Sequence, residues 1–371
     1  MAHASPKAEL LIAAAARKNR IVKDLTTMGI KVFERKKHIS FLADLPDTIN
    51  AFVPKDKRND PAYMKKLIKD ITENHYIYMI SPAEYFLLDF ANLTDSQKHE
   101  FVGEHEKNLL CRATRGNDWR ILWDKNSCYQ AFQQYFKRDA VAVTSESDRD
   151  ALFAFIKAHG SAIIKEARGT LGKGIQIVHD DSSEMNEYWA SIRDSLSKKA
   201  TYIAEELIVQ CDELARFHPT SVNTVRIMTF RKDGEVTFLG SFFRMGSGNS
   251  IVDNAGSGGI FAEVDIQSGR IVGSGISKTG KRFNFHPDTG VQIKDYQMPK
   301  WPDLLDLCKK MATVLNDQPY TGWDCALTDN GWVMVEGNSQ AQFVNQYPNR
   351  HGMRELVEKT FYALIDSKKG R

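Results

Sequence analysis

The stretch Tyr320–Gln346, YTGWDCALTDNGWVMVEGNSQAQFVNQ, contains two apolar runs separated by Asp329-Asn330-Gly331. A three-residue loop with glycine at its left-handed position is a common β-hairpin connection, so the stretch predicts a hairpin. The predicted register contains three cross-strand pairs: Thr328 with Trp332, Ala326 with Met334, and Asp324 with Glu336.

Side chains alternate along a strand, so Asp324, Glu336 and Asn338 are predicted to share one face of this hairpin. Two carboxylates about 4 to 5 Å apart repel by roughly 3 to 4 kcal/mol at an effective dielectric constant of about 20. A divalent cation converts that repulsion into binding, and two carboxylates with an amide oxygen suit Mg²⁺. The alternative is an ordinary surface hairpin whose acidic residues face water. The opposite face is predicted to enter a core; it carries Cys325, Leu327, Val333 and Val335.

The composition is that of a globular protein with more than one domain. The chain has 371 residues and a formal net charge of +3, which gives no general attraction to nucleic acid. Its five cysteines lack CxxC spacing and are expected to be reduced thiols in a cytoplasmic protein. No apolar run approaches the roughly 20 residues of a membrane helix, so no membrane span is predicted.

The order of predicted elements indicates an α+β protein with mostly antiparallel sheets. Residues 1–122 are expected to form a helical N-terminal domain, with helix starts at Ser81-Pro82 and Thr94. Two α+β subdomains are predicted to follow, a smaller one over 123–205 and a larger one over 206–371. The predicted helices after residue 122 are 124–136, 147–159, 184–199, 302–316 and 351–365. The predicted strands are 140–144, 161–165, 175–179, 202–207, 222–231, 236–245, 260–265 and 270–274, besides the hairpin.

A glycine-rich loop, GTLGKG at Gly169–Gly174, is predicted to connect two strands. It is not a Walker A motif or a dinucleotide fingerprint, because a strand rather than a helix follows it. Glycines between antiparallel strands let backbone N–H groups approach an anion, and Lys165 at the end of the incoming strand can add its ammonium. A glycine hairpin without a ligand is the alternative.

Three further stretches carry polar groups at strand ends. Ala204–Ile208, AEELI, suggests a hinge whose backbone meets an adenine edge, with a solvated strand end as the alternative. Alternation in the second stretch, SVNTVRI, directs Arg226 away from the core, where an arginine can clamp a phosphate or carboxylate, and Arg244 is a second candidate. The third, Val252–Gly259, is either a loop that closes over substrate or a flexible turn.

Each of these motifs is weak alone, but their order along the chain resembles the ATP-grasp superfamily over about residues 123–365. The sequence SVNTVRI and the Glu336-Gly337-Asn338 end resemble the sugar-transfer associated ATP-grasp branch in particular. The segments EYFLLDF and NDWRILWDKNSCYQAFQQYFKRD resemble the N-terminal part of that branch. The resemblance implies an ATP-grasp fold, in which two α+β subdomains with antiparallel sheets clamp ATP.

The resemblance also implies a role for each matching residue. Lys125 and Lys165 would contact the ATP phosphates, and Arg226 would stabilise the transferring phosphoryl group, with Arg244 near an acyl phosphate or substrate carboxylate. The glycine lid lacks the adjacent glycines of many relatives. The resemblance implies that Gly169, Gly172 and Gly174 form the lid. It places Glu206, Leu207 and Ile208 at adenine, or Glu205 if the alignment shifts by one residue, and it places Glu213 at the ribose. Asp324, Glu336 and Asn338 would bind two Mg²⁺ ions, for which Mn²⁺ is an expected substitute.

The implied activity is an ATP-dependent carboxylate–amine or carboxylate–hydroxyl ligase that works through an acyl phosphate. Its expected partners are a small-molecule carboxylate and an amine or hydroxyl acceptor, such as an amino acid and a sugar or peptide-like compound. His218 is a candidate base for the second step, and a structural histidine beside Pro219 is the alternative. A small-molecule kinase and a nucleotide-binding regulator without turnover are the competing classes of function.

Overall fold

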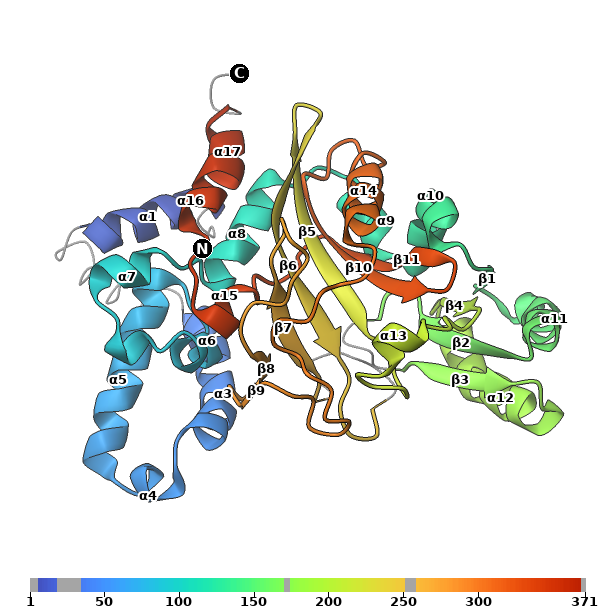
Figure 1. The fold of residues 1–371 in the computed structure, drawn as a ribbon, viewed down its shortest axis with the longest axis horizontal. Coiled ribbons are helices and arrows are strands. Elements are labelled where there is room, and N and C mark those ends of the chain that lie inside the picture. The colour runs from blue at the N-terminus through green and yellow to red at the C-terminus, as the bar shows by residue number, and fades with distance from the viewer. Residues whose placement is uncertain (1–5, 19–34, 170–173, 251–257, 368–371) are drawn as a thin grey trace.

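The computed structural model describes residues 6–18, 35–169, 174–250 and 258–367. Gly172 and most of the loop Val252–Gly259 lie outside these ranges, as do residues 19–34 of the predicted helical N-terminal domain. Within the described ranges the chain forms two antiparallel sheets and a mainly helical N-terminal region (Figure 1). The predicted α+β class is therefore confirmed.

The N-terminal region is helical, as the sequence predicts. Ser81 and Glu84 form a reciprocal capping box, and Thr94 and Gln97 form another, so both predicted helix starts are confirmed. The helices are α1 (Pro6–Lys18), α3 (Arg35–Phe52), α4 (Lys55–Arg58), α5 (Pro61–Tyr78), α6 (Pro82–Leu87), η1 (Phe90–Asn92), α7 (Asp95–His99), α8 (Glu104–Thr114) and α9 (Trp119–Trp123).

The smaller sheet has four strands in the order β1-β4-β2-β3. Its strands are β1 (Ala140–Val143), β2 (Ser161–Glu166), β3 (Gln176–His179) and β4 (Tyr202–Glu205). The short η2 (Glu146–Asp148) leads into α11 (Arg149–His159), which shares a core with α12 (Ser182–Ser197) and the sheet. The glycine-rich loop joins β2 to its antiparallel neighbour β3, so the predicted strand–loop–strand arrangement is confirmed.

The larger sheet has seven antiparallel strands in the order β11-β10-β5-β6-β7-β8-β9. Its strands are β5 (Thr224–Lys232), β6 (Glu235–Met245), β7 (Ile260–Val264), β8 (Gly275–Ser277), β9 (Arg282–Phe283), β10 (Tyr320–Thr328) and β11 (Gly331–Asn338). The strands β10, β5 and β6 are adjacent and long, and β10 is buried along almost its whole length. Its burial and its pairing with β11 on one side and β5 on the other fix the side chains that β10 carries.

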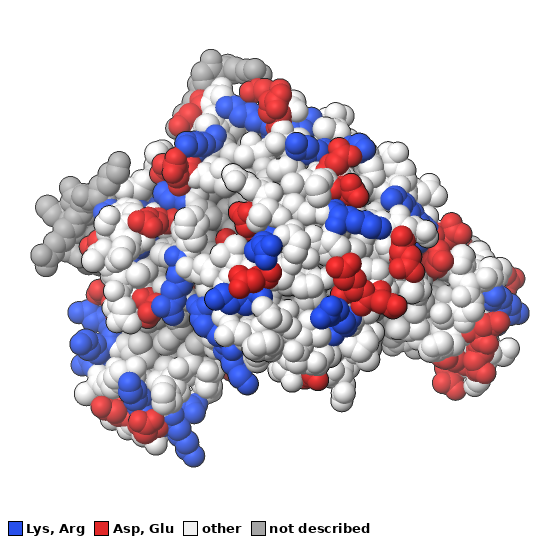
Figure 2. Space-filling model, viewed as in Figure 1, with Lys and Arg blue, Asp and Glu red and all other residues white. Residues whose placement is uncertain are grey.

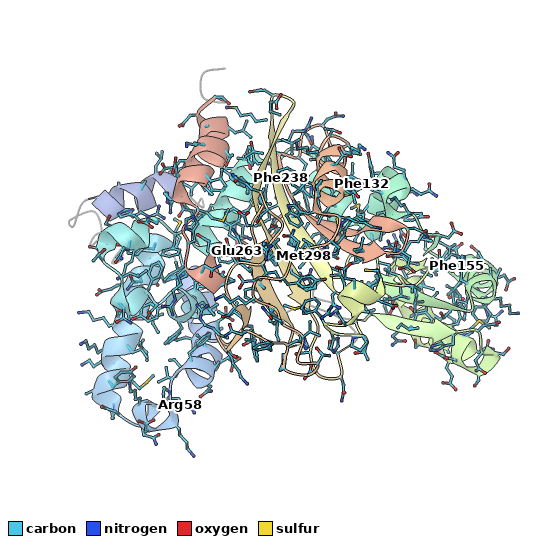
Figure 3. The ribbon with its side chains drawn as sticks, in the orientation of Figure 1. Arg58, Phe132, Phe155, Phe238, Glu263 and Met298 are labelled. Carbon is cyan, nitrogen blue, oxygen red and sulfur yellow. The ribbon has the colours of Figure 1, made fainter. Side chains whose placement is uncertain are left out.

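Helices cover both faces of the larger sheet. One face packs on α10 (Lys125–Phe136) and α14 (Trp301–Ala312); Phe132 of α10, labelled in Figure 3, lies with its ring centroid 5.4 Å from that of Trp323. The other face packs on the N-terminal helices and on the end of the chain, where α15 (Gln346–Asn349), α16 (Arg354–Val357), η4 (Glu358–Tyr362) and α17 (Ala363–Ser367) lie. The short α13 (Asp212–Ala215) lies between the two sheets in the chain.

The hairpin forms as predicted, but part of its register was wrong. The loop has two residues, so Thr328 pairs with Gly331, Leu327 with Trp332 and Cys325 with Met334. A β-bulge then restores the predicted pair of Asp324 with Glu336. Because the loop has two residues rather than three, the core face holds Cys325 and Leu327 together with Trp332 and Met334, not with Val333 and Val335 as predicted.

Three other element predictions were inaccurate. Residues 270–274 form isolated bridges through Arg270 and Ile271 rather than a strand. The strand predicted to reach Leu207 ends at Glu205, and α14 ends at Ala312 rather than Asn316. Apolar pattern alone does not locate such element ends.

Charged side chains of both signs are interspersed on the face shown in Figure 2, in keeping with the near-balanced composition. Among the described residues, no helix combines the length and apolar character that crossing a bilayer requires.

Candidate active site

Asp324 lies at the centre of a cluster of charges on three adjacent strands. Arg226 of β5 is its cross-strand neighbour, and Arg244 is carried by β6. The Arg226 guanidinium contacts both Asp324 carboxylate oxygens, and Arg244 Nη1 donates to Oδ2 at 2.5 Å. Val225 and Ile227, the neighbours of Arg226 in the chain, are buried in the core on the opposite face of the strand. The alternation of side chains therefore directs Arg226 away from that core, as predicted.

Glu336 and Asn338 extend this cluster along β11. Glu336 Oε1 lies 3.6 Å from Arg226 Nη2 and accepts a hydrogen bond from Asn338 Nδ2 at 3.1 Å. Between them, Gly337 packs closely on the chain, since a Cβ there would lie 2.8 Å from Leu122 Cδ2. The predicted metal-binding set is therefore brought together on one face, beside both predicted arginines.

The charges in this cluster shift the acidic groups in opposite directions. Burial would raise the pKa of Asp324, but the guanidinium groups of Arg226 and Arg244 lower it to about 2. Loss of hydration and the adjacent Asp324 carboxylate raise the pKa of Glu336. The Asp324 side chain is 2% exposed and that of Glu336 is 45% exposed, so the cluster is open to solvent at the Glu336 end.

Lys125 holds the start of the glycine-rich loop. Its Nζ donates to the carbonyl oxygens of Glu166 at 3.1 Å and Gly169 at 2.7 Å. Burial lowers the pKa of Lys125; the charge of Glu336 opposes that shift and the charge of Lys165 adds to it. The side chains of Lys125, Lys165 and Glu336 therefore lie close enough for their charges to affect the pKa of Lys125.

Lys165 pairs with Glu205, a carboxylate predicted to contact adenine. Lys165 Nζ donates to Glu205 Oε1 at 2.9 Å, and Arg138 Nε donates to Oε2 at 3.1 Å. Burial would raise the pKa of Glu205, but Lys165 and Arg138 lower it to about 2. The sequence did not single out Arg138, because a lone arginine after a helix resembles a solvated side chain.

The other predicted contacts lie around these groups. Glu206, Leu207 and Ile208 directly follow β4, and Glu206 Oε2 accepts a hydrogen bond from the backbone N–H of Asp139 at 3.3 Å. The predicted ribose ligand Glu213 lies on α13, where the structure joins it to Tyr296 at 3.2 Å rather than to either charge cluster. Gly174 has a φ of +71°, which favours glycine, and Gly172 is not described.

A different group of side chains has the spacing of a metal site. The ligand atoms of Asp139, His159 and Glu206 all lie within 4.8 Å of one another. Asp139 is exposed, and its Oδ2 lies 3.6 Å from His159 Nε2.

His218 is held as a structural residue. It is 2% exposed, its Nδ1 lies 2.8 Å from Ser221 Oγ, and its Nε2 lies 3.0 Å from the carbonyl oxygen of Gly248. Because both ring nitrogens have partners in the protein, this arrangement favours the structural alternative over a general base.

The antiparallel sheets, the glycine-rich loop between β2 and β3 and the charged residues at the strand ends agree with the ATP-grasp resemblance of the sequence. A family model described as sugar-transfer associated ATP-grasp matches residues 105–361, and the chain belongs to that family. No match is found among curated proteins.

Several solved structures resemble this fold at low sequence identity. A D-alanine–D-alanine ligase from Bacillus anthracis is 14% identical, with a TM-score of 0.41 over 67% of this chain and 70% of that one. A biotin carboxylase from Campylobacter jejuni is 13% identical, with a TM-score of 0.44 over 70% and 50% of the two chains. A D-cycloserine synthetase is 12% identical, with a TM-score of 0.42 over 77% and 82%.

ATP-grasp enzymes bind ATP, usually with Mg²⁺, and the donor set of this site fits that pair. Asp324, Glu336 and Asn338 offer the hard oxygen atoms that Mg²⁺ prefers, and Lys125 and Lys165 offer cations for phosphates. Both Asp324 oxygens are engaged by arginine, so a metal ion there requires at least one guanidinium to change partner. A phosphate group is a suitable new partner for a planar, bidentate guanidinium.

Proposed function

We propose that the protein is an ATP-dependent ligase that joins a carboxylate to an amine or a hydroxyl group through an acyl phosphate. The observation that carries the proposal is the convergence of Asp324, Glu336 and Asn338 with Arg226 and Arg244 on one face of the larger sheet. These groups combine oxygen ligands for a divalent cation with guanidinium groups for the charge that develops on a phosphoryl group.

In the first step a carboxylate oxygen of the substrate attacks the γ-phosphorus of ATP, and the bond to the bridging β–γ oxygen breaks to release ADP. Lys125 and Lys165 hold the phosphate oxygens, and Arg226 with Arg244 neutralises the negative charge of the transferring group. Asp324, Glu336 and Asn338 would hold Mg²⁺, which would supply further neutralisation of the phosphate charge. Positioning and electrostatics then account for most of the rate, since phosphoryl transfer needs little covalent participation by protein.

In the second step the amine or hydroxyl attacks the acyl carbon, the bond to the phosphate oxygen breaks, and the proton of the nucleophile passes to solvent or phosphate. Glu205 to Ile208 would meet adenine and Glu213 the ribose, beneath a lid containing Gly169, Gly172 and Gly174. We propose an amino acid as the carboxylate and a sugar or peptide-like compound as the acceptor, prompted by the family description.

The test is ADP release from Mg²⁺-ATP across a panel of amino acids and hydroxy acids, with and without hydroxylamine. Hydroxamate formation with one acid is the expected result, because hydroxylamine traps an acyl phosphate. ADP release driven by a sugar or polyol without hydroxamate would instead identify a kinase. ATP binding without turnover, even when acceptors are added to each acid, would contradict the ligase proposal.

A further inference from the structure

Arg138 is a buried guanidinium between the two sheets that the proposed mechanism does not use. It follows Lys137, which ends α10 in the left-handed conformation with a φ of +50°. Its side chain is 5% exposed, and its guanidinium lies over the ring of Phe136 at 4.7 Å. The chain reversal and the stacking direct this arginine inward rather than to solvent.

The N–H groups of Arg138 divide between the two sheets. Nε donates to Glu205 Oε2 at 3.1 Å and Nη2 contacts the same carboxylate, at the end of β4 in the smaller sheet. Nη1 donates to the carbonyl oxygen of Met334 at 2.6 Å, in β11 of the larger sheet. The Arg138 guanidinium thus bonds both β4, which precedes the predicted adenine contacts, and β11, which carries the predicted metal ligands Glu336 and Asn338.

On the β4 side, Arg138 shares Glu205 with Lys165. The carboxylate is 3% exposed, so it requires nearby positive charge to remain ionised. Without Arg138, Lys165 would face this buried carboxylate without that second cation, and less of its charge would be available to a phosphate. Arg138 therefore keeps Lys165 effective as a phosphate ligand.

On the β11 side, Arg138 fixes the backbone next to the bulge. Met334 pairs with Cys325, and the next paired residue, Glu336, lies opposite Asp324, so Val335 is the inserted residue. The bulge places Glu336 on the Asp324 face although Met334 enters the core. A hydrogen bond to the Met334 carbonyl holds the start of the bulge and with it the direction of the Glu336 side chain.

We propose that Arg138 is a positioning residue that holds the nucleotide-binding end of β4 and the metal-binding end of β11 in one arrangement. This inference rests on the proposed function of the site. It extends that function by assigning a role to a residue that touches neither ATP nor metal. A purely structural buried ion pair would stabilise the fold without affecting the two binding sites separately.

Two variants distinguish these roles, with ADP and Mn²⁺ as the probes. In Arg138→Met both links are lost, so the affinity for ADP is expected to fall. The affinity of the ADP complex for Mn²⁺ is expected to fall about tenfold or more, the usual effect of removing a group behind a metal ligand. In Arg138→Lys an ammonium can still neutralise Glu205 but cannot also reach Met334 as a fork does. Its ADP affinity is expected to stay within about twofold of wild type, while Mn²⁺ affinity falls.

Arg149→Met is the matched control, because Arg149 also lies over a phenylalanine ring, Phe153 at 4.3 Å, but is 41% exposed on α11. Calorimetry measures ADP binding, and electron paramagnetic resonance measures bound Mn²⁺.

Unchanged affinities in Arg138→Met with a lowered melting temperature would make the residue merely structural. If that variant does not fold, equal losses of both affinities, or none, in Arg138→Lys would overturn the proposal. A wild-type protein that binds neither probe would instead refute the proposed function.

Discussion

Glu106 in the helical region and Asp324 in the larger sheet are both buried carboxylates placed between two arginines. Glu106 accepts hydrogen bonds from Arg17 Nη2 at 2.6 Å, Arg354 Nη2 at 2.8 Å and the Tyr362 hydroxyl at 2.7 Å. Asp324 is engaged by Arg226 and Arg244. The same local chemistry therefore occurs twice in one chain.

The surroundings of the two carboxylates differ. Glu106 is fully buried, and its partners come from α1, α16 and η4, so the cluster fastens the described ends of the chain to α8. The Asp324 cluster continues through the half-exposed Glu336 to Asn338 and approaches Lys125. A closed cluster of this kind stabilises the fold, whereas an open one with excess oxygen ligands can exchange a guanidinium for a metal ion.

The largest expected effect on activity is on turnover at the open cluster. Asp324→Asn or Glu336→Gln should lower Mg²⁺-dependent ADP formation by roughly 10²- to 10³-fold, because a bound metal ion supplies several kcal/mol of charge stabilisation. The fold should remain intact, as circular dichroism would show. Asp194→Asn, on the surface of α12, is the charge-matched control. Near-normal ADP formation in both site variants would exclude the metal assignment.

The closed cluster should respond in stability instead. Glu106→Gln leaves two arginines without their buried counter-charge, and breaking such a pair typically costs about 3 to 5 kcal/mol in the free energy of unfolding. Urea unfolding measures this loss, and ADP affinity of the folded protein should match wild type. If Glu106→Gln weakened ADP binding at unchanged stability, the division between the two clusters would be wrong.

Glu84 sharpens the comparison, because it is a buried carboxylate whose partners are the N–H groups of Ser81 and Glu104 and the Tyr347 hydroxyl. Burial and the charge of Glu104 raise the pKa of Glu84 from 4.5 to about 7. Because the pKa is higher in the folded state, folding favours the protonated Glu84 side chain. Its contribution to the free energy of unfolding is therefore complete below pH 4.5 and is lost as the pH rises through 7.

That contribution amounts to about 3 kcal/mol. Urea unfolding between pH 4.5 and 8 should show a decline in stability that Glu84→Gln removes and Asp194→Asn retains. Glu106 behaves in the opposite way, since its two arginines lower its pKa despite burial, and its contribution is lost as the pH falls. An identical pH dependence in wild type and Glu84→Gln would contradict the assignment to Glu84.

The smallest expected effect tests the geometry of the open cluster. Arg226→Lys keeps the positive charge but loses the bidentate fork, and one charge-assisted hydrogen bond contributes about 1.5 to 3 kcal/mol. ADP formation should therefore fall roughly tenfold to a hundredfold. Steady-state assays measure the rate, and a wild-type rate would return Arg226 to a structural role.

The sequence predicted the pair of Asp324 with Glu336 although its count of the turn was wrong by one residue. The loop is shorter than predicted, and the bulge at Val335 shifts the register back by one residue. A bulge leaves no mark on the alternation of apolar residues in this stretch, because Val333, Met334 and Val335 are all apolar. The core face of β11 could therefore not be assigned from pattern alone.

The family was predictable because the order of short motifs along the chain is itself informative. Arg138 was not, since its role depends on Met334, almost 200 positions later, and on a carboxylate in another sheet. The engagement of Asp324 by two arginines was also hidden, because it requires three strands to lie side by side.

The most direct test of the central claim is a crystal structure of the complex with Mn²⁺ and a non-hydrolysable ATP analogue. The account predicts an anomalous peak bound by Asp324, Glu336 and Asn338, with Arg226 turned from Asp324 toward a phosphate. A peak at Asp139, His159 and Glu206 instead, with Asp324 still held by both arginines, would contradict it.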